Sequence, residues 1–163
     1  MEAIQLPGIA TEMKLSMKES SMLTPDYFNS FGEGFLPGYL GIQTLEVSAG
    51  RLRTCLDIAE HHLAPHRFLH AGTIVSLADT TAGYGCFANL PKGATGFTTL
   101  ELKSNHFGTA RYGSVECLAT AVHLGETTQV WDATVTDGAA GKLISMFRCT
   151  QLIFYPRKRS PEI

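Results

Sequence analysis

The chain has 163 residues and a formal net charge of −2; 44% of its residues are hydrophobic and 17% are charged. This length suits one domain with its own hydrophobic core. The near-neutral charge excludes the broad basic surface of a nucleic-acid-binding protein, and no run approaches the roughly 20 apolar residues of a membrane span. We therefore expect a globular protein that has neither nucleic acid nor a membrane as a partner.

The four cysteines suggest a reducing compartment. They are scattered along the chain without C-x-x-C spacing: Cys55, Cys86, Cys117 and Cys149. A disulfide framework is typical of small secreted domains, whereas this chain is long enough to fold without one. The N-terminus also lacks the basic and apolar regions of a signal peptide. We expect reduced, mostly buried thiols and a cytoplasmic location.

The distribution of structural signals suggests one folded unit over residues 23–156. Residues 1–22 show no clear periodicity and are expected to form a loosely attached arm, while residues 157–163 form a C-terminal tail. Thr24 suits a helix N-cap, and Pro25 suits the first helical position after it. This short helix is expected to end in the glycines of FGEGFLPG.

A β-hairpin and a long helix follow. The runs Leu40–Val47 and Arg51–Ile58 alternate imperfectly between apolar and polar residues, with a Ser-Ala-Gly turn between them. After a loop, apolar residues recur at helical spacing over about Ala71–Ala88, which is too long for an ordinary strand. Gly83 and Gly85 are poor helix formers, so their small size must allow the close approach of a sheet or of another helix.

The last third of the chain has the pattern of antiparallel strands. Trp131, Ala133 and Val135 alternate with polar residues, as in a sheet with one covered face. Glycine-containing turns help to separate four strand-like segments: Gly96–Asn105, Ser114–His123, Thr127–Thr136 and Lys142–Phe154. The order of two strands, one helix and four strands predicts an α+β fold, in which one antiparallel sheet wraps around one apolar helix.

Two short motifs lack the context that would give them a function. Gly83–Ala88 matches the dinucleotide-binding pattern G-x-G-x-x-A, but it lies at the end of a helix and not between a strand and a helix. His62, His66 and His70 are spaced by four, yet Pro65 interrupts the span and the ligand set is incomplete. We expect neither a dinucleotide cofactor nor a metal ion.

Asp79 stands in the middle of the apolar helix. Burying a carboxylate in such surroundings costs free energy unless a partner compensates its charge. A protein that keeps one there therefore uses it for packing or for a reaction. One interpretation is structural, with Thr80, Thr81 or a backbone amide satisfying the charge. The other is catalytic, because His70-Ala71-Gly72 begins the same helix and its small side chains leave unpaired amides reachable. Such amides stabilise an oxyanion, and together with a carboxylate they supply the groups for acyl transfer to water.

The spacing of these two parts predicts a dimer. Ala71 and Asp79 are eight residues apart, or about 12 Å along a helix, but both must lie close to one reacting carbonyl group. Two antiparallel helices from two chains satisfy this condition, with the amide from one chain and the carboxylate from the other. Gly83 and Gly85 would permit the close approach of these helices. The catalytic interpretation thus implies a symmetric homodimer with two shared sites.

Residues 69–80, LHAGTIVSLADT, resemble the L-H-G-G…A-D-T segment of hotdog-fold acyl-CoA thioesterases of the PaaI-like, phenylacetate-degradation branch. The resemblance runs from Gly38 to Tyr155 and includes three further segments: Thr98–Phe107, Gly125–Trp131 and Gly141–Ile144. It implies a hotdog fold, in which a curved antiparallel sheet wraps around one long helix. It also implies a homodimeric acyl-CoA thioesterase, often paired into a dimer of dimers. Such an enzyme needs no cofactor, because coenzyme A is part of its substrate.

The resemblance further implies roles for single residues. Asp79 matches the catalytic acid, which acts as nucleophile or as general base for water. His70, Ala71 and Gly72 match the helix start whose amide polarises the thioester carbonyl, and Thr99 matches a hydroxyl residue that orients the water. Four hairpin residues match a region that contacts coenzyme A: Gly125, Glu126, Thr127 and Thr128.

The chain departs from the family pattern at two places. Ala64 stands where relatives commonly have an asparagine in the loop before the helix, and His66 or His62 could substitute for the lost amide. Glu126 stands where relatives often have a basic residue that meets a phosphate. Two arginines could replace that residue, although each could equally be an ion-pair partner: Arg111 and Arg148.

Two other functions stay open. The same fold could bind an acyl-CoA without cleaving it, as a sensor or interaction module, and the lost amide at Ala64 favours this alternative. A hydratase or dehydratase would need a histidine paired with an acid near the helix, and His70 and Asp79 could meet only across chains. Three residues could line an acyl pocket but are more typical of a core: Ile74, Tyr84 and Phe87.

Overall fold

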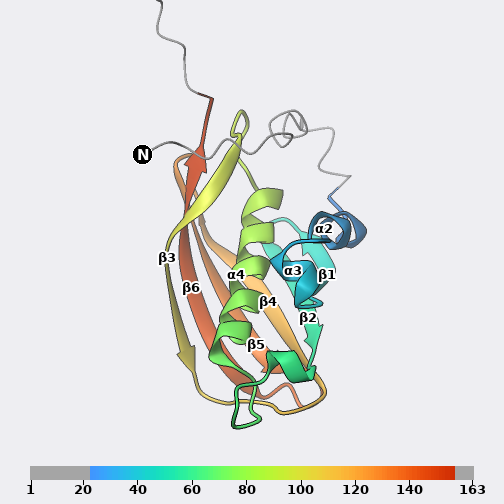
Figure 1. Cartoon of the computed structure of the whole chain (residues 1–163). Coiled ribbons are helices and arrows are strands. Elements are labelled where there is room, and N and C mark those ends of the chain that lie inside the picture. The colour runs from blue at the N-terminus through green and yellow to red at the C-terminus, as the bar shows by residue number, and fades with distance from the viewer. Residues whose placement is uncertain (1–22, 157–163) are drawn as a thin grey trace, which may run out of the picture.

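The computed structural model describes residues 23–156, so the arm and tail expected at residues 1–22 and 157–163 lie outside the described residues. One antiparallel sheet curves around the long helix α4 (Figure 1). The helical elements are α2 (Pro25–Phe31), α3 (Leu36–Tyr39), the 3-10 turn η2 (Glu60–His62) and α4 (Ala71–Ala88). The strands are β1 (Gln43–Ser48), β2 (Arg51–Asp57), β3 (Gly96–His106), β4 (Ser114–Leu124), β5 (Thr128–Asp137) and β6 (Leu143–Phe154). The predicted α+β fold is confirmed.

The first described helix begins as the sequence predicts. Thr24 is the N-cap of α2, and its Oγ1 accepts a hydrogen bond from the Tyr27 N–H at 3.2 Å, with Pro25 in the first turn. Gly32 ends the helix. The chain then forms a second short helix, α3, where the sequence analysis expected only a glycine-rich turn. Pro37, at the start of α3, has a backbone angle that suits a first helical turn.

Helix α2 packs its aromatic side chains on the second half of α4. The ring centroids of Phe28 and Tyr84 lie 4.8 Å apart, and those of Phe31 and Phe87 lie 5.6 Å apart. Both α2 and α3 lie on the side of α4 away from β3 (Figure 1). Tyr84 and Phe87 are therefore packing residues, as their type suggested.

The order of the strands puts β3 at one edge of the sheet. The order is β1-β2-β4-β5-β6-β3, and every neighbouring pair is antiparallel. Strand β3 follows α4 in the chain but pairs with β6, the last strand, so the chain crosses the concave face of the sheet between β2 and β3. Within residues 23–156 the outer edge of β3 has no partner strand.

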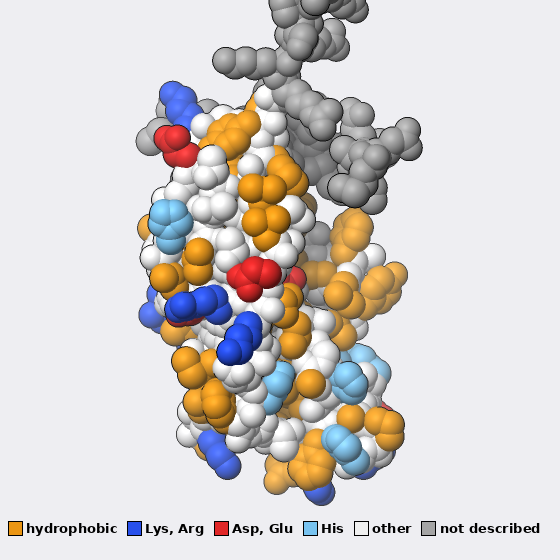
Figure 2. All heavy atoms as spheres, turned by 90° about the vertical axis from the view of Figure 1, so that its left-hand side faces the viewer, with side chains coloured by type: hydrophobic (Ala, Val, Ile, Leu, Met, Phe, Trp, Pro, Cys, Tyr) orange, Lys and Arg blue, Asp and Glu red, His pale blue; other side chains and the backbone are white. Residues whose placement is uncertain are grey.

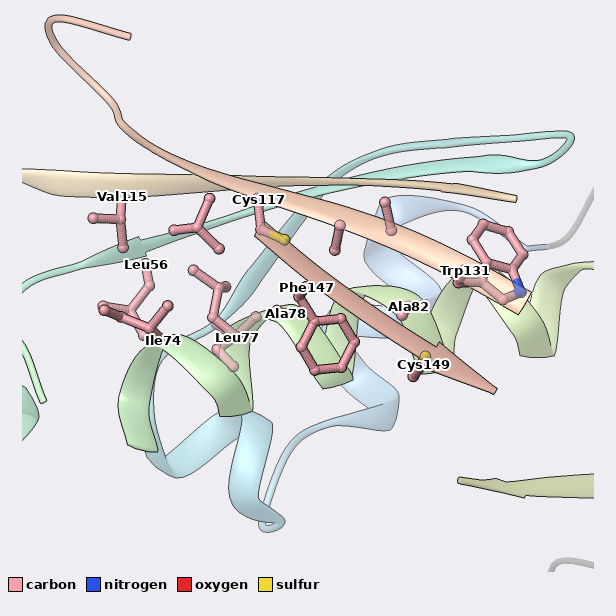
Figure 3. Close-up of a cluster of buried hydrophobic side chains, with 14 of the residues drawn as sticks. Leu56, Ile74, Leu77, Ala78, Ala82, Val115, Cys117, Trp131, Phe147 and Cys149 are labelled. Atoms are coloured by element: carbon pink, nitrogen blue, oxygen red, sulfur yellow. The ribbon is translucent and has the colours of Figure 1, made fainter. Parts of the chain in front are cut away.

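The side of α4 that faces the sheet builds the core (Figure 3). Trp131 on β5 is fully buried there, and a Cβ placed on Gly85 would lie 2.7 Å from its ring. A Cβ on Gly83 would lie 3.5 Å from the ring of Phe97 on β3. Both glycines thus face aromatic rings of their own sheet. The sheet alternative is thereby confirmed: the small size of the two glycines lets aromatic rings of the sheet approach the helix.

This contact predicts different outcomes for the two glycines. Gly85→Ala is expected to lower the free energy of unfolding by about 1–3 kcal/mol, because the buried Trp131 ring cannot move away from the new methyl group. Gly83→Ala is the matched control, since its Cβ would make an ordinary contact and alanine favours a helix. Denaturant unfolding of both variants checks the prediction. Equal destabilisation of the two would contradict it.

The cysteines agree with the expected reduced thiols. The structure shows Cys55, Cys86, Cys117 and Cys149 as free thiols, and the last three are buried. Burial raises the pKa of each of these three to about 12, so they remain neutral thiols at neutral pH. No helix in the described part is long and apolar enough to cross a bilayer. A cytoplasmic location stays a prediction.

Candidate functional site

Asp79 lies on α4, where it meets β3. Its Oδ1 accepts a hydrogen bond of 3.4 Å from the Thr99 hydroxyl. The side chain is half-buried. Burial raises the pKa of the Asp79 carboxyl, while the hydrogen bond from Thr99 lowers it by a smaller amount. The fold therefore brings together the acid and the hydroxyl residue that the sequence analysis singled out, in surroundings that make the acid a better base.

Thr99 lies immediately before a β-bulge. The pairing of β3 with β6 changes register between Thr99 and Glu101, so Leu100 is the extra residue. Bulges redirect neighbouring side chains and occur often beside active sites. The Thr99 hydroxyl also lies 3.0 Å from Oε1 of Gln151, a fully buried residue on β6. The sequence analysis missed Gln151, although a polar residue at an inward position of an apolar strand was a signal.

The first turn of α4 offers a free backbone donor. His70 is the N-cap, and its Nδ1 accepts the Gly72 N–H at 2.8 Å. Gly72 suits this position, because a Cβ there would lie 2.9 Å from that nitrogen. No acceptor within residues 23–156 meets the Ala71 N–H. The expectation of two reachable amides is corrected: the His70 ring occupies the Gly72 amide, and the Ala71 amide remains at the positive end of the helix dipole.

His62 fixes the start of α4 from the core. Its side chain is 2% exposed, and its Nδ1 accepts the Ala59 N–H at 2.9 Å. Its carbonyl oxygen accepts the His70 N–H at 2.9 Å and the Thr73 hydroxyl at 3.0 Å. Burial lowers the pKa of the His62 ring, with a smaller effect from a neighbouring histidine. This buried ring cannot replace the amide missing at Ala64, and no group of possible ligands in the described chain could hold a metal ion.

A cavity of about 440 Å³ opens at the start of α4. It is lined by five residues that the sequence analysis named: Ala64, His66, His70, Ala71 and Ile74. Five more residues line it: Phe68, Leu69, His106, Gly108 and Thr109. Of the two histidines proposed to replace the missing loop amide, His66 is the one that faces this cavity. His106 was not predicted, because nothing local shows that the end of β3 meets the start of α4.

The β4–β5 hairpin lies at the opposite end of α4. Gln129, just after the hairpin, donates a hydrogen bond of 2.8 Å to the carbonyl of Asn89, the C-cap of α4. The Tyr155 hydroxyl donates to the Glu126 carbonyl at 2.7 Å. Within one chain, the structure therefore keeps four predicted substrate-binding residues away from the cavity: Gly125, Glu126, Thr127 and Thr128.

The two candidate arginines have different surroundings. The Arg148 guanidinium donates to both carboxylate oxygens of Asp132, with 2.7 Å between Nη2 and Oδ2, and this contact raises the pKa of Arg148. Arg111 lies over the ring of Phe68, 3.9 Å from its centroid, and Phe68 lines the cavity. Arg148 is thus an ion-pair partner on the outer face of the sheet, whereas Arg111 lies close to the cavity.

The sequence profile of the thioesterase superfamily matches residues 66–144. Among curated relatives, the chain is 33% identical over 119 residues to a 1,4-dihydroxy-2-naphthoyl-CoA hydrolase from Listeria monocytogenes. This alignment covers 73% of this chain and 95% of that enzyme. The profile match spans α4, β3, β4, β5 and the hairpin at residues 125–128. The Listeria match is long enough to relate almost the whole of that enzyme to this chain.

Solved structures share the fold. Thioesterase PA1618 from Pseudomonas aeruginosa, solved as a glutamine-to-alanine mutant, has a TM-score of 0.75 and 27% identity, and the match covers 80% of this chain and 93% of that one. The E. coli PaaI protein from the phenylacetic acid degradation operon has a TM-score of 0.71 and 20% identity, covering 84% and 95%. The profile match and the Listeria relative confirm the resemblance: the chain belongs to the hotdog-fold thioesterase superfamily and is a thioester hydrolase.

Proposed function

We propose that the protein hydrolyses an acyl-CoA thioester to a free carboxylic acid and coenzyme A. The observation that carries the proposal is the half-buried Asp79 carboxylate, held against the Thr99 hydroxyl in surroundings that raise its pKa. The free Ala71 N–H at the start of α4 supplies the second part of an acyl-transfer site, and the Listeria relative is a hydrolase of a CoA thioester. Hydrolysis neither oxidises nor reduces the substrate, so the proposal includes no redox cofactor.

In the proposed reaction Asp79 acts in one of two ways. As a general base, its carboxylate removes a proton from water while the water oxygen bonds to the thioester carbon. The carbonyl oxygen gains negative charge, which the Ala71 N–H and the helix dipole stabilise. The C–S bond then breaks, and the departing thiolate of coenzyme A takes the proton from Asp79. As a nucleophile, Asp79 would instead bond to the carbon and expel the thiolate, and water would cleave the resulting anhydride.

We further propose that two chains share each site. Asp79 lies eight residues along α4 from Ala71, or about 12 Å, and is not among the residues that line the cavity. Leu102 on β3 pairs with the inward-facing Cys149 but stays 42% exposed, because α4 does not cover this part of the strand. Pairing two β3 edges about a two-fold axis would continue the sheet and set α4 beside an antiparallel copy of itself.

This arrangement would also assemble a coenzyme A site. The hairpin at residues 125–128 lies near the end of α4, so it would lie beside the start of the other chain's α4. Arg111 lies at the start of α4, over the ring of Phe68, which lines the cavity. Figure 2 shows the β3 side of the molecule, where histidine side chains gather in the lower part, the end at which α4 begins. We propose that the acyl group enters the cavity and that the phosphates lie between Arg111 and the hairpin. The pairing of two dimers stays a prediction.

The test is coenzyme A release from a panel of aliphatic and aromatic acyl-CoAs. The panel includes 1,4-dihydroxy-2-naphthoyl-CoA because of the Listeria relative. We expect turnover of at least one member. Tight binding without any turnover would instead support an acyl-CoA-binding protein, an alternative that Ala64 favours because it leaves the cavity without the usual loop amide.

A further inference from the structure

The Thr99 hydroxyl faces two acceptors but has one proton. Its Oγ1 lies 3.4 Å from Asp79 Oδ1 and 3.0 Å from Gln151 Oε1. Because a hydroxyl has a single O–H donor, a Thr99 side chain that donates to Gln151 leaves Asp79 without that hydrogen bond. The orientation of the Gln151 amide therefore decides whether the Asp79 carboxylate receives a donor.

The Gln151 amide has two partners that suit either orientation. The residue is 0% exposed, and its Nε2 lies 3.3 Å from the Cys149 sulfur. A thiol is a weak acceptor, but it can also donate its S–H. A half-turn of the amide exchanges its oxygen and its nitrogen at nearly unchanged positions. The nitrogen would then donate to Thr99, and the oxygen would accept from Cys149.

We propose that Gln151 is a positioning residue that turns the Thr99 hydroxyl toward Asp79 when Asp79 is ionised and away from it when Asp79 carries a proton. In the ionised state Cys149 donates to Gln151, Gln151 donates to Thr99, and Thr99 donates to Asp79. In the protonated state each donor is reversed: Asp79 donates to Thr99, Thr99 donates to Gln151, and Gln151 donates to Cys149. The amide orientation in the structure, with Oε1 toward Thr99 and Nε2 toward Cys149, is the one that this state requires. The proton concerned is the one that Asp79 takes from water, so this inference rests on the proposed function.

The groups around Asp79 fit this exchange. Thr99 lies against it from β3, and Cys149 on β6 is close enough to be affected by its charge. Burial, and after it the Asp79 charge, raises the pKa of Cys149 to about 12, so Cys149 keeps the S–H that the ionised state requires. The exchange needs only the rotation of one hydroxyl, one thiol hydrogen and one amide inside a packed core.

Two buried glutamines allow a matched spectroscopic test. Gln129 and Gln151 are cross-strand partners and both are 0% exposed, but Gln129 bonds to the C-cap of α4 instead of to Thr99. In protein labelled with [¹⁵N]glutamine and [¹³C]aspartate, we expect the Gln151 side-chain amide signals to shift in one step, at the midpoint pH of the Asp79 carboxyl carbon. The Gln129 signals should stay constant. In Thr99→Val the Gln151 step should vanish.

Two results would overturn the proposal. One is a Gln151 signal that does not titrate in the wild-type protein. The other is a step that persists in Thr99→Val, because the direct field of the Asp79 charge would then explain it without a hydrogen-bonded chain. A titration step without turnover of any acyl-CoA would keep the positioning inference and overturn only the proposed function.

An activity measurement provides a second readout. Gln151→Met is expected to lower kcat about tenfold. This is the loss expected when the ionised Asp79 no longer receives its hydrogen bond from Thr99. In a protein that already carries Thr99→Val, Gln151→Met should not lower kcat any further, because the hydroxyl through which Gln151 acts is absent. Gln129→Met is the control for the loss of a buried amide and should leave kcat unchanged. Additive losses in the double variant would contradict a path through Thr99.

Discussion

Asp79→Asn is expected to abolish thioester hydrolysis and to leave the protein at least as stable as the wild type at neutral pH. Asparagine keeps the size of the side chain and a hydrogen-bonding partner for Thr99, but it can neither take a proton from water nor attack a carbonyl. General-base catalysis contributes about 10²–10⁴-fold, so coenzyme A release should fall by at least about 10²-fold. Steady-state kinetics and denaturant unfolding on the same preparations check both parts.

The expected gain in stability follows from the direction of the pKa shift. Burial raises the pKa of Asp79, so the folded protein holds this proton to a higher pH than the unfolded chain does. The stabilisation present at low pH is therefore lost as the pH rises through the folded-state pKa. At neutral pH the ionised carboxylate lowers the free energy of unfolding, and asparagine removes this cost. A clearly destabilised Asp79→Asn protein would instead indicate a structural carboxylate.

The same direction sets the pH dependence of the wild-type enzyme. Asp79 works in its ionised form as a base or nucleophile, so kcat/KM should rise with pH through the pKa of this group. Because that pKa is raised, the rise should lie above the pH range in which an ordinary carboxyl titrates.

Asp132→Asn is the matched control for charge. Asp132 pairs with Arg148 on the exposed outer face of the sheet, so this variant makes the same chemical change far from the cavity. It should keep full activity. Loss of activity in both variants would indicate a general effect of charge or folding and not a role of Asp79 in the reaction.

The elements of the fold were predictable because their signals are local. The limits of α4, from Ala71 to Ala88, agree with the helical spacing of apolar residues, and the capping role of Thr24 needs only three neighbouring residues. The edge position of β3 was not predictable, since it depends on pairing between β3 and β6, about fifty residues apart. The partner of Gly85 was left open for the same reason: only the folded sheet brings Trp131 to it.

In the candidate site, too, residues with local signals were predictable and residues placed by long-range packing were not. Asp79 and the start of α4 stand out because one helix carries a carboxylate in apolar company and small residues at its first turn. Gln151 and His106 were missed, because strand pairing and loop packing bring them to Thr99 and to the cavity. The orientation of side chains could not be predicted either, because spacing alone does not show that the His70 ring turns back onto the amide of Gly72. Short-range patterns thus predicted the reactive groups, and the fold determines which of them are free.

Ala71→Pro is expected to remove the oxyanion donor without damage to the fold. Ala71 is the first residue of α4, where proline is favoured and its missing N–H breaks no helical hydrogen bond. His70 already has the extended backbone that a residue before proline prefers, with φ −69° and ψ 137°. Loss of one such donor costs about 10²–10³-fold in kcat. Unchanged activity would show that the donor is another amide, such as that of Gly72 after the His70 ring moves away.

Mixing the two inactive variants then tests whether two chains share a site. If Ala71 of one chain acts with Asp79 of the other, a dimer of one Ala71→Pro chain and one Asp79→Asn chain has one intact site and one that carries both changes. Random reassociation of equal amounts makes half of the dimers mixed, so activity should return to about one quarter of the wild-type value. If each site instead lies within one chain, every site in the mixture carries one defect, and activity stays at the level of the separate variants. Two differently tagged chains, unfolded and refolded together and purified through both tags, give the mixed dimer directly, and its activity decides between the two arrangements.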